Sequence, residues 1–208
     1  MIYDHLFPTS DIISLISARI IQLSSNDSIL LLHPSAEIGM PTSSCGLFSS
    51  VEFFDKLQLD PLPNSLNIST SSLRSEWMEK HLAIVLANSG AKISTRASFH
   101  QTSSNTGEIK GSAPIDGTVS FKNLHNIELP ISNTHKWYCY IHSETLPSKP
   151  SFSSQRGDSS FETWSITPLT IPNVFETKIG LGSTESPNTI DICFEIAKNY
   201  LETNLFLK

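Results

Sequence analysis

The chain has 208 residues, of which 38% are hydrophobic and only 16% are charged. This length suffices for one sizeable core or for two tightly coupled lobes, and the low charge leaves Ser, Thr and Asn to form the polar surface. The formal net charge of −6 excludes the general positive field through which proteins attract nucleic acid, so no nucleic-acid partner is expected.

The cysteines and histidines give no sign of a metal site. Cys45, Cys139 and Cys193 are far apart, odd in number and without a Cys-x-x-Cys pair, so neither a disulfide framework nor a thiolate zinc site is indicated. The seven histidines are dispersed, and each is more often a structural residue than a ligand in such a pattern. A reducing compartment and no bound metal are therefore expected.

The N-terminus does not have the pattern of a secretory signal. It has no basic leading region, and Ser14, Ser17 and Arg19 interrupt its apolar stretch. No run approaches the roughly 18 apolar residues that suggest a membrane-spanning helix. The sequence predicts a cytoplasmic protein without a transmembrane segment, and it leaves peripheral membrane contact open.

The first part of the chain predicts a strand, a helix and a second strand. Residues 3–7 form a short apolar run that stops at Pro8, and apolar residues then recur at helical spacing over 11–23, with Thr9 or Ser10 available as the N-cap. Residues 29–32 are an unbroken apolar run, which is typical of a parallel strand covered on both faces. This is the pattern of a βαβ crossover.

A second helical unit follows the first. A short helix is predicted over 51–57 and a longer one over 73–89, which Gly90 ends; residues 91–95 then return as a strand of the same parallel sheet. Residues 1–96 are thus predicted to form a Rossmann-like domain of the nucleotide-binding type.

From Ala97 onwards the apolar period changes from helical to alternating. Strands are predicted at 118–121, 137–142, 161–166 and 175–181, with a Ser/Pro-rich exposed connection or mobile hairpin over 145–160. Residues 97–182 are therefore predicted to form a mainly antiparallel sheet. A last helix, from Thr189 to about Leu205, dominates the segment 183–208 and is expected to pack on the first domain.

Several stretches of the first hundred residues resemble the start of the geranylgeranyl reductase family of flavoproteins. The resemblance rests on Tyr3-Asp4 and on the segments 18–21, 29–32, 36–41, 45–49, 78–79, 82–83 and 90–93. It implies an α/β fold, in which an FAD/NAD(P)-binding Rossmann-like βαβ domain carries an inserted or appended mainly antiparallel sheet. It also implies an activity, the FAD-dependent reduction of isoprenoid double bonds.

The chain departs from this family where FAD would be held. The family's Gly-x-Gly-x-x-Gly turn falls on Thr9, Asp11 and Ser14, and its ribose-binding acidic residue falls on His33. No Gly-Asp-Ala segment follows, and the chain is shorter than a complete reductase. The resemblance therefore implies a shortened, degenerate relative in which these FAD contacts are lost, and no cofactor is expected.

The same comparison suggests an apolar pocket. The family's Pro-x-x-Cys-Ser-Gly stretch beside the flavin appears here as residues 41–46, and an aromatic strand over 137–141 would roof a substrate cavity. The candidate lining residues, which more often pack as core, are Pro41, Cys45, Gly46, Trp137, Tyr138, Tyr140 and Trp164.

Three interpretations remain open from the sequence. The favoured one is a non-catalytic homologue that keeps the scaffold to bind a protein partner or an apolar ligand such as an isoprenoid or lipid, because fold alone does not carry function. The alternative is an active FAD-dependent oxidoreductase of the geranylgeranyl reductase type. The third is an unrelated α+β protein. Whether the chain is an enzyme is thus left open, with no catalytic residue assigned.

Overall fold

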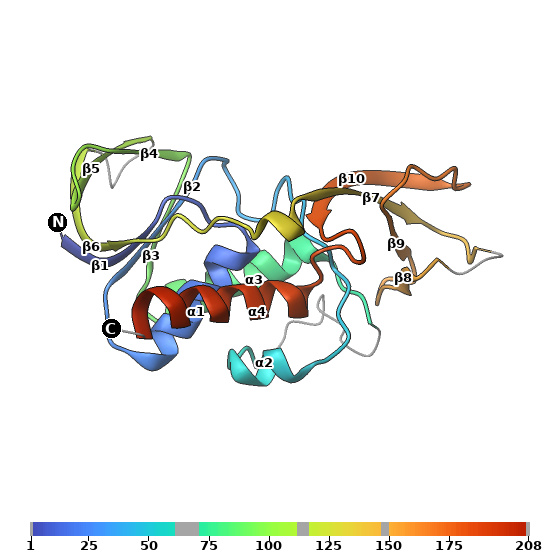
Figure 1. Cartoon of the computed structure of the whole chain (residues 1–208), viewed down its shortest axis with the longest axis horizontal. Coiled ribbons are helices and arrows are strands. Elements are labelled where there is room, and N and C mark those ends of the chain that lie inside the picture. Colours follow the sequence, from blue (N-terminus) through green and yellow to red (C-terminus); the bar gives the residue numbers. More distant parts are fainter. Residues whose placement is uncertain (1, 61–70, 112–116, 147–149, 207–208) are drawn as a thin grey trace. The chain divides into compact units, whose positions relative to one another are not determined.

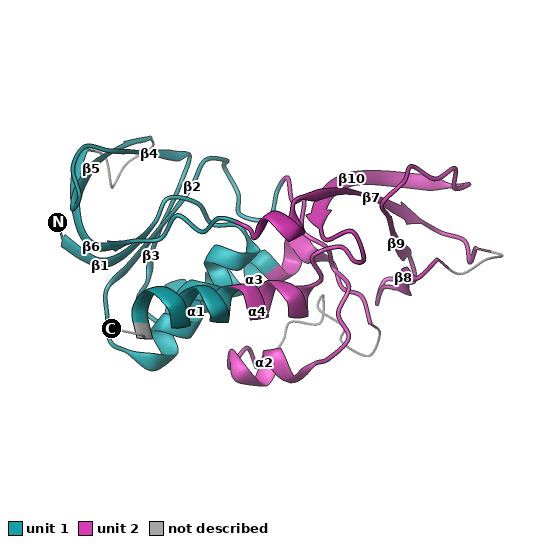
Figure 2. Ribbon diagram, in the orientation of Figure 1, with its two compact units in different colours: residues 1–40, 79–128, 197–208 teal, residues 41–78, 129–196 magenta. Residues whose placement is uncertain are grey.

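The computed structural model describes residues 2–60, 71–111, 117–146 and 150–206. The chain folds as two compact units, each built from separate segments (Figure 2). Unit 1 comprises residues 1–40, 79–128 and 197–208, and unit 2 comprises residues 41–78 and 129–196. These boundaries do not coincide with the predicted ones at residues 96 and 182.

Unit 1 contains the predicted parallel βαβ arrangement. Strand β1 (Ile2–Phe7) pairs in parallel with β2 (Ile29–His33), and β2 pairs in parallel with β3 (Lys92–Thr95) (Figure 1). Helix α1 (Ile12–Ser24) connects the first two strands. The predicted α/β fold class is confirmed, and an unrelated α+β fold is excluded.

The strands of residues 97–182, predicted to form a mainly antiparallel sheet, pair antiparallel with one another but are divided between two sheets. Strands β4 (Ala97–Gln101), β5 (Thr106–Gly111) and β6 (Gly117–Leu124) complete one six-stranded sheet in the order β3-β2-β1-β6-β5-β4. Strand β6 lies parallel to β1 and pairs the edge of β1 that β2 leaves free. The sheet curls so that β4 contacts β2, and one core cluster includes side chains from both halves.

Unit 2 contains a separate antiparallel sheet with the strand order β10-β7-β9-β8. Its strands are β7 (His135–His142), β8 (Phe152–Gln155), β9 (Phe161–Ser165) and β10 (Val174–Gly182). The short helix α2 (Glu52–Lys56) and the 3₁₀ turn η1 (Ile131–Asn133) also belong to this unit. A buried cluster on one face of the sheet forms its core.

The segment 145–160, predicted to be an exposed connection or a mobile hairpin, contains β8, which pairs antiparallel with the next strand, β9. Residues 147–149 lie outside the described part. The Arg156-Gly157-Asp158 turn does connect two strands, but the side chain of Arg156 is buried, with 3% of the residue exposed. The buried carboxylate of Glu162 pairs with this guanidinium and accounts for its burial.

Two helices have residues in both units. Helix α3 (Ser75–Asn88) ends at Gly90, whose positive φ of 100° is the expected left-handed stop. Helix α4 (Ile190–Leu201) continues as a π-helical turn, η2 (Glu202–Phe206). Within the described ranges, no helix has both the length and the apolar character needed to cross a bilayer.

Candidate functional site

Side chains at and just before the N-terminus of α1 form hydrogen bonds with one another and with a backbone amide of the first turn. Asp11, not Thr9 or Ser10 as predicted, is the N-cap, and its Oδ1 accepts a hydrogen bond from the Ser14 amide at 2.9 Å. The Thr9 hydroxyl donates to Asp11 Oδ2 at 3.0 Å and lies 3.2 Å from the Ser14 hydroxyl. The structure thus brings together the three positions where the family has its glycines, in one hydrogen-bonded group.

His33, at the end of β2, is also held by neighbours in unit 1. Its Nε2 lies 3.0 Å from the Glu37 carbonyl oxygen, which can only accept, so Nε2 carries the hydrogen. Nδ1 then accepts from the Ser10 hydroxyl at 2.8 Å. Burial lowers the pKa of His33, which favours this neutral form. The two contacts fix the orientation of the ring at the position where the family resemblance predicts the ribose-binding acidic residue.

Several of the predicted pocket residues are packed together as core. Trp137, Trp164 and Cys45 are at most 4% exposed and pack together with Cys139 and Ile141 as core. Pro41 is exposed, and Gly46 is buried against the backbone at Leu73.

Strand alternation explains why the aromatic residues of β7 are divided. Successive side chains point to opposite faces of a strand, so Tyr138 and Tyr140 lie on the other face from Trp137 and Cys139. Both tyrosines are half-buried. Burial, with a contribution from the nearby Glu162 carboxylate, raises the pKa of Cys45 well above its ordinary value, so this thiol is unreactive.

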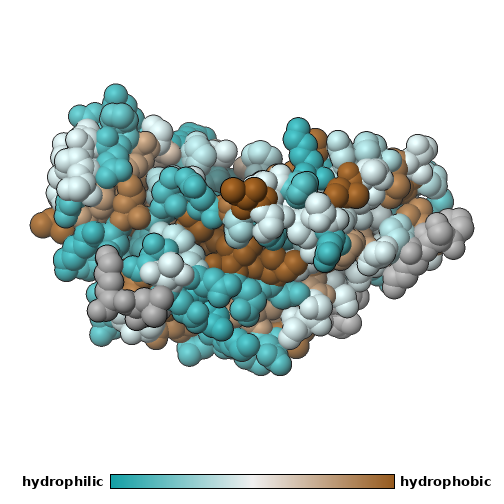
Figure 3. Space-filling model, in the orientation of Figure 1, coloured by the Kyte–Doolittle hydropathy of each residue, from teal (hydrophilic) through white to brown (hydrophobic). Residues whose placement is uncertain are grey.

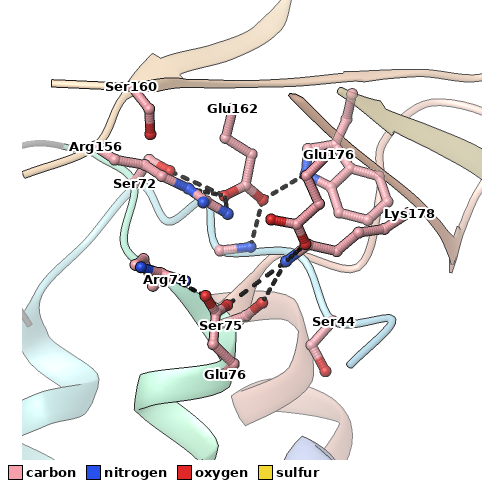
Figure 4. Close-up of polar contacts among 12 residues, drawn as sticks. Ser44, Ser72, Arg74, Ser75, Glu76, Arg156, Ser160, Glu162, Glu176 and Lys178 are labelled. Carbon is pink, nitrogen blue, oxygen red and sulfur yellow. Dashed lines mark hydrogen bonds and ion pairs between the residues drawn. The ribbon is translucent and has the colours of Figure 1, made fainter. Parts of the chain in front are cut away.

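Unit 2 contains a fully buried carboxylate, Glu162, that the sequence analysis did not single out. Glu162 Oε1 accepts from the Gly46 amide at 2.8 Å and from the Trp164 indole at 2.6 Å (Figure 4). Its Oε2 accepts from Arg156 Nε at 2.9 Å and from the Ser72 hydroxyl at 3.3 Å. Arg156 Nη2 lies 2.7 Å from Oε2, and the side chains of this ion pair are 2% and 0% exposed.

A second charged group lies close to this pair (Figure 4). Lys178 Nζ is 3.4 Å from the Ser75 hydroxyl, 3.6 Å from Glu76 and 3.7 Å from Glu176. Burial alone would raise the pKa of Glu76, but Lys178 and Arg74 outweigh this effect, so the pKa lies below its usual value.

These charges are paired with one another and with donors of unit 2. Every carboxylate of the group faces a cation, and the Glu162 oxygens are occupied by donors from four segments of unit 2. A signal for Glu162 does exist in the sequence, because it stands two residues before Trp164 and therefore shares its inward face. Nothing local marks Arg156, whose partner lies across a turn.

Among the residues that the structure describes, no group of three or more His, Cys, Asp or Glu side chains is arranged to bind a metal ion.

Comparisons with known proteins bear on the fold. The sequence matches no family model, and no curated protein matches it significantly. A geranylgeranyl bacteriochlorophyll reductase-like protein from Thermoplasma acidophilum is similar in structure, with a TM-score of 0.59 and 12% identity over 98% of this chain and 62% of its own.

Two hydroxylating enzymes are also similar in structure. The flavin-dependent monooxygenase PieE, solved with FAD and substrate, has a TM-score of 0.54 at 10% identity, over 88% of this chain and 50% of its own. The anhydrotetracycline hydroxylase OxyS from Streptomyces rimosus has a TM-score of 0.52 at 14% identity, over 87% and 52%. The chain thus spans between half and 62% of these proteins. At such identities the likeness shows the fold alone, and it confirms the predicted resemblance at that level.

Proposed function

We propose that this chain, which has the fold of flavin-dependent monooxygenases and of geranylgeranyl reductase-like proteins, is a non-catalytic relative that acts by binding a protein partner. The observation that carries the proposal is the closure of the N-terminus of α1 by Asp11. In a Rossmann-like domain this helix end, with its free amides and partial positive charge, holds the cofactor pyrophosphate.

The residues at this helix end do not fit a dinucleotide. Asp11 already accepts the Ser14 amide, and its negative charge stands where a phosphate would need to approach. The side chains of Thr9 and Ser14 occupy the two places where glycine would allow close approach of the backbone. His33 offers no carboxylate to a ribose hydroxyl, because its ring is engaged with Ser10 and Glu37.

A protein partner is favoured over an apolar small molecule by the arrangement of unit 2. The residues expected to line an apolar pocket, Trp137 and Trp164, are instead packed as core. Apolar side chains are exposed on the other face of the same sheet, where Ile179 of the edge strand β10 is 56% exposed and Leu181 is 40% exposed. Figure 3 shows apolar residues among polar ones in this region.

An extended apolar segment of a partner protein suits such an edge, since it can add a strand to the sheet and place alternate side chains on the exposed row. The net charge of −6 makes an anionic membrane surface a poorer candidate.

The test is a titration of purified protein with FAD, followed by flavin fluorescence and melting temperature. No saturable binding is expected for the wild type. Asp11→Gly removes the charge and the cap together, and should show weak binding that the wild type lacks, whereas Asp191→Gly, at the start of α4, should not.

A yellow preparation, or saturable wild-type binding in the low micromolar range, would refute the proposal in favour of an active FAD-dependent oxidoreductase. Native mass spectrometry of gently purified protein adds a second test. It should show no co-purifying isoprenoid or lipid, and a stoichiometric lipid adduct would restore the apolar-ligand interpretation.

A further inference from the structure

Four side chains of unit 1 form a continuous hydrogen-bonded line that has no part in the proposed function. Asp27 Oδ2 is 3.2 Å from His5 Nε2, His5 Nδ1 is 2.8 Å from His125 Nε2, and His125 Nδ1 is 3.1 Å from the Tyr200 hydroxyl. His5 and His125 are 4% and 2% exposed. The ring of Phe7 stacks on His125 at 4.4 Å and fixes its plane.

With both imidazoles neutral, only one order of hydrogens satisfies all three contacts. The Asp27 carboxylate can only accept, so His5 carries its hydrogen on Nε2 and accepts at Nδ1 from His125 Nε2. His125 Nδ1 must then accept from the Tyr200 hydroxyl. Burial, together with the neighbouring His5, lowers the pKa of His125 to about 3, which keeps that ring neutral at pH 7. Every donor in the line therefore points toward Asp27.

The Asp27 end of this line opens into a pocket of about 270 Å³. The pocket lies at the end of α1 that carries Ser24 and Ser25, the opposite end from the Asp11 cap. Asp27, His5 and Asn123 give it a polar side, and Ile21 and Leu205 give it an apolar side. This combination suits a small amphiphilic molecule.

Two carboxylates, Asp4 and Asp27, and one ammonium, Lys122, line the pocket, so one carboxylate has no lysine or arginine partner there. Asp4 is fully engaged, since Lys122 Nζ lies 2.6 Å from one oxygen and the amide and hydroxyl of Ser28 donate to the other at 2.8 and 2.7 Å. Asp27 accepts only the hydrogen bond from His5 within the described part of the chain, and its side chain is 48% exposed. Lys122 is 69% exposed and also feels the charge of Asp27.

We propose that this pocket is a binding site for a small primary alkylammonium compound. The ammonium donates to Asp27, and the alkyl chain contacts Ile21 and Leu205. The hydrogen-bond line has a positioning role, because the donor from His5 orients the carboxylate of Asp27. The other carboxylate of the pocket, Asp4, already holds an ammonium, that of Lys122. The site is independent of whether FAD binds.

The experiment is a two-dimensional amide NMR titration with butylammonium, compared with butyrate and butanol at equal ionic strength. Saturable shifts are expected with butylammonium at the amides of Ile21, Asp27 and Asn123, and none with butyrate. Asp27→Asn should raise the dissociation constant at least about tenfold, since a charged hydrogen bond is lost. Its exposure makes this nearly isosteric change compatible with folding.

A second variant shifts the affinity the other way. Lys122→Met removes the competing ammonium and frees Asp4, so butylammonium should bind about three- to tenfold more tightly. Glu108→Gln removes an exposed carboxylate of β5 away from the pocket and should leave the affinity unchanged. Equal affinities of the wild type and Asp27→Asn would overturn the proposal. So would shifts that do not saturate and vanish at about 0.15 M salt, which would indicate general attraction to the negative chain.

Discussion

At the scale of single residues, Glu162 is the most heavily coordinated side chain described in unit 2. It joins the backbone at Gly46, the segment at Ser72, the indole of Trp164 and the turn that carries Arg156. A buried ion pair adds little over a well-packed apolar pair, but removing one partner leaves an uncompensated charge in the interior. The two side chains should therefore be strongly coupled in stability.

A double-mutant cycle measures this coupling. Glu162→Gln and Arg156→Met should each lower the free energy of unfolding by about 3–5 kcal/mol. The double variant should lose clearly less than the sum of the two, because it leaves no unpaired charge. Denaturant unfolding followed by tryptophan fluorescence gives the values.

The exposed pair of Lys56 and Glu52 is the matched control, with side chains 56% and 74% exposed. Lys56→Met should change the free energy of unfolding by less than about 1 kcal/mol. Additive losses in the Glu162 and Arg156 cycle would show that the two charges do not depend on each other.

His125 gives unit 1 a distinct dependence on pH. Its pKa is about 3 when folded, against 6.5 when unfolded, so below 6.5 the unfolded state binds the extra proton. The neutral His125 ring therefore leaves the free energy of unfolding at its full value above pH 6.5, and this free energy decreases as the pH falls from 6.5 toward 3. Between pH 6 and 5 the free energy of unfolding should drop by about 1.2 kcal/mol from this residue.

His125→Gln should remove most of this dependence of the free energy of unfolding on pH, whatever the variant does to the free energy of unfolding at pH 7. His100→Gln, on an exposed site of β4, should leave the slope as in the wild type. Denaturant unfolding at several pH values provides the comparison, and an unchanged slope in His125→Gln would contradict the assignment.

At the scale of elements, the segment that begins at Cys45 runs close to the segment before α3. The Gly46 carbonyl accepts from the Leu73 amide at 2.9 Å, and a Cβ at Gly46 would stand 2.0 Å from Leu73 O and 2.7 Å from Glu162 Oε2. Glycine is therefore required here by close approach. At Gly90 the requirement is different, because its φ is 100° and nothing lies within 4 Å of an added Cβ.

The two glycines should respond differently to alanine. In Gly46→Ala the new Cβ would push the segment at Gly46 away from the backbone at Leu73. The free energy of unfolding should fall by about 3 kcal/mol, at the upper end of the range for overpacking. Gly90→Ala meets only the left-handed backbone penalty and should cost about 1 kcal/mol. Near-UV circular dichroism should change for Gly46→Ala alone, since Trp164 shares the carboxylate of Glu162. Equal costs would mean that the segment at Gly46 can move away.

At the scale of the whole molecule, the fold and the residues at the start of α1 lead to different expectations about a cofactor. The fold is similar to that of a flavin-dependent monooxygenase and of a geranylgeranyl bacteriochlorophyll reductase-like protein, and the residues at the start of α1 bond to one another. A fold supplies a scaffold, and function depends on the side chains placed on it. The FAD titration of wild type and Asp11→Gly decides between these two descriptions.

The sequence by itself determined the local units of this protein. Helical spacing over residues 11–23, apolar runs at 3–7 and 29–32 and the stop at Gly90 predicted α1, β1, β2 and the end of α3, because these signals depend on neighbours in the chain. The alternating runs at 137–142 and 161–166 predicted β7 and β9 in the same way.

Only the tertiary structure decided which distant residues meet. Pairing of β6 with β1, the burial of Arg156 against Glu162 and the line from Asp27 to Tyr200 join segments that no local pattern connects. Asp11 was visible as an acidic residue at a helix start, but its place as the cap depended on backbone geometry at the end of β1. Periodicity fixes how a segment folds, whereas a buried charge or a strand edge is satisfied by whatever partner the packed chain brings to it.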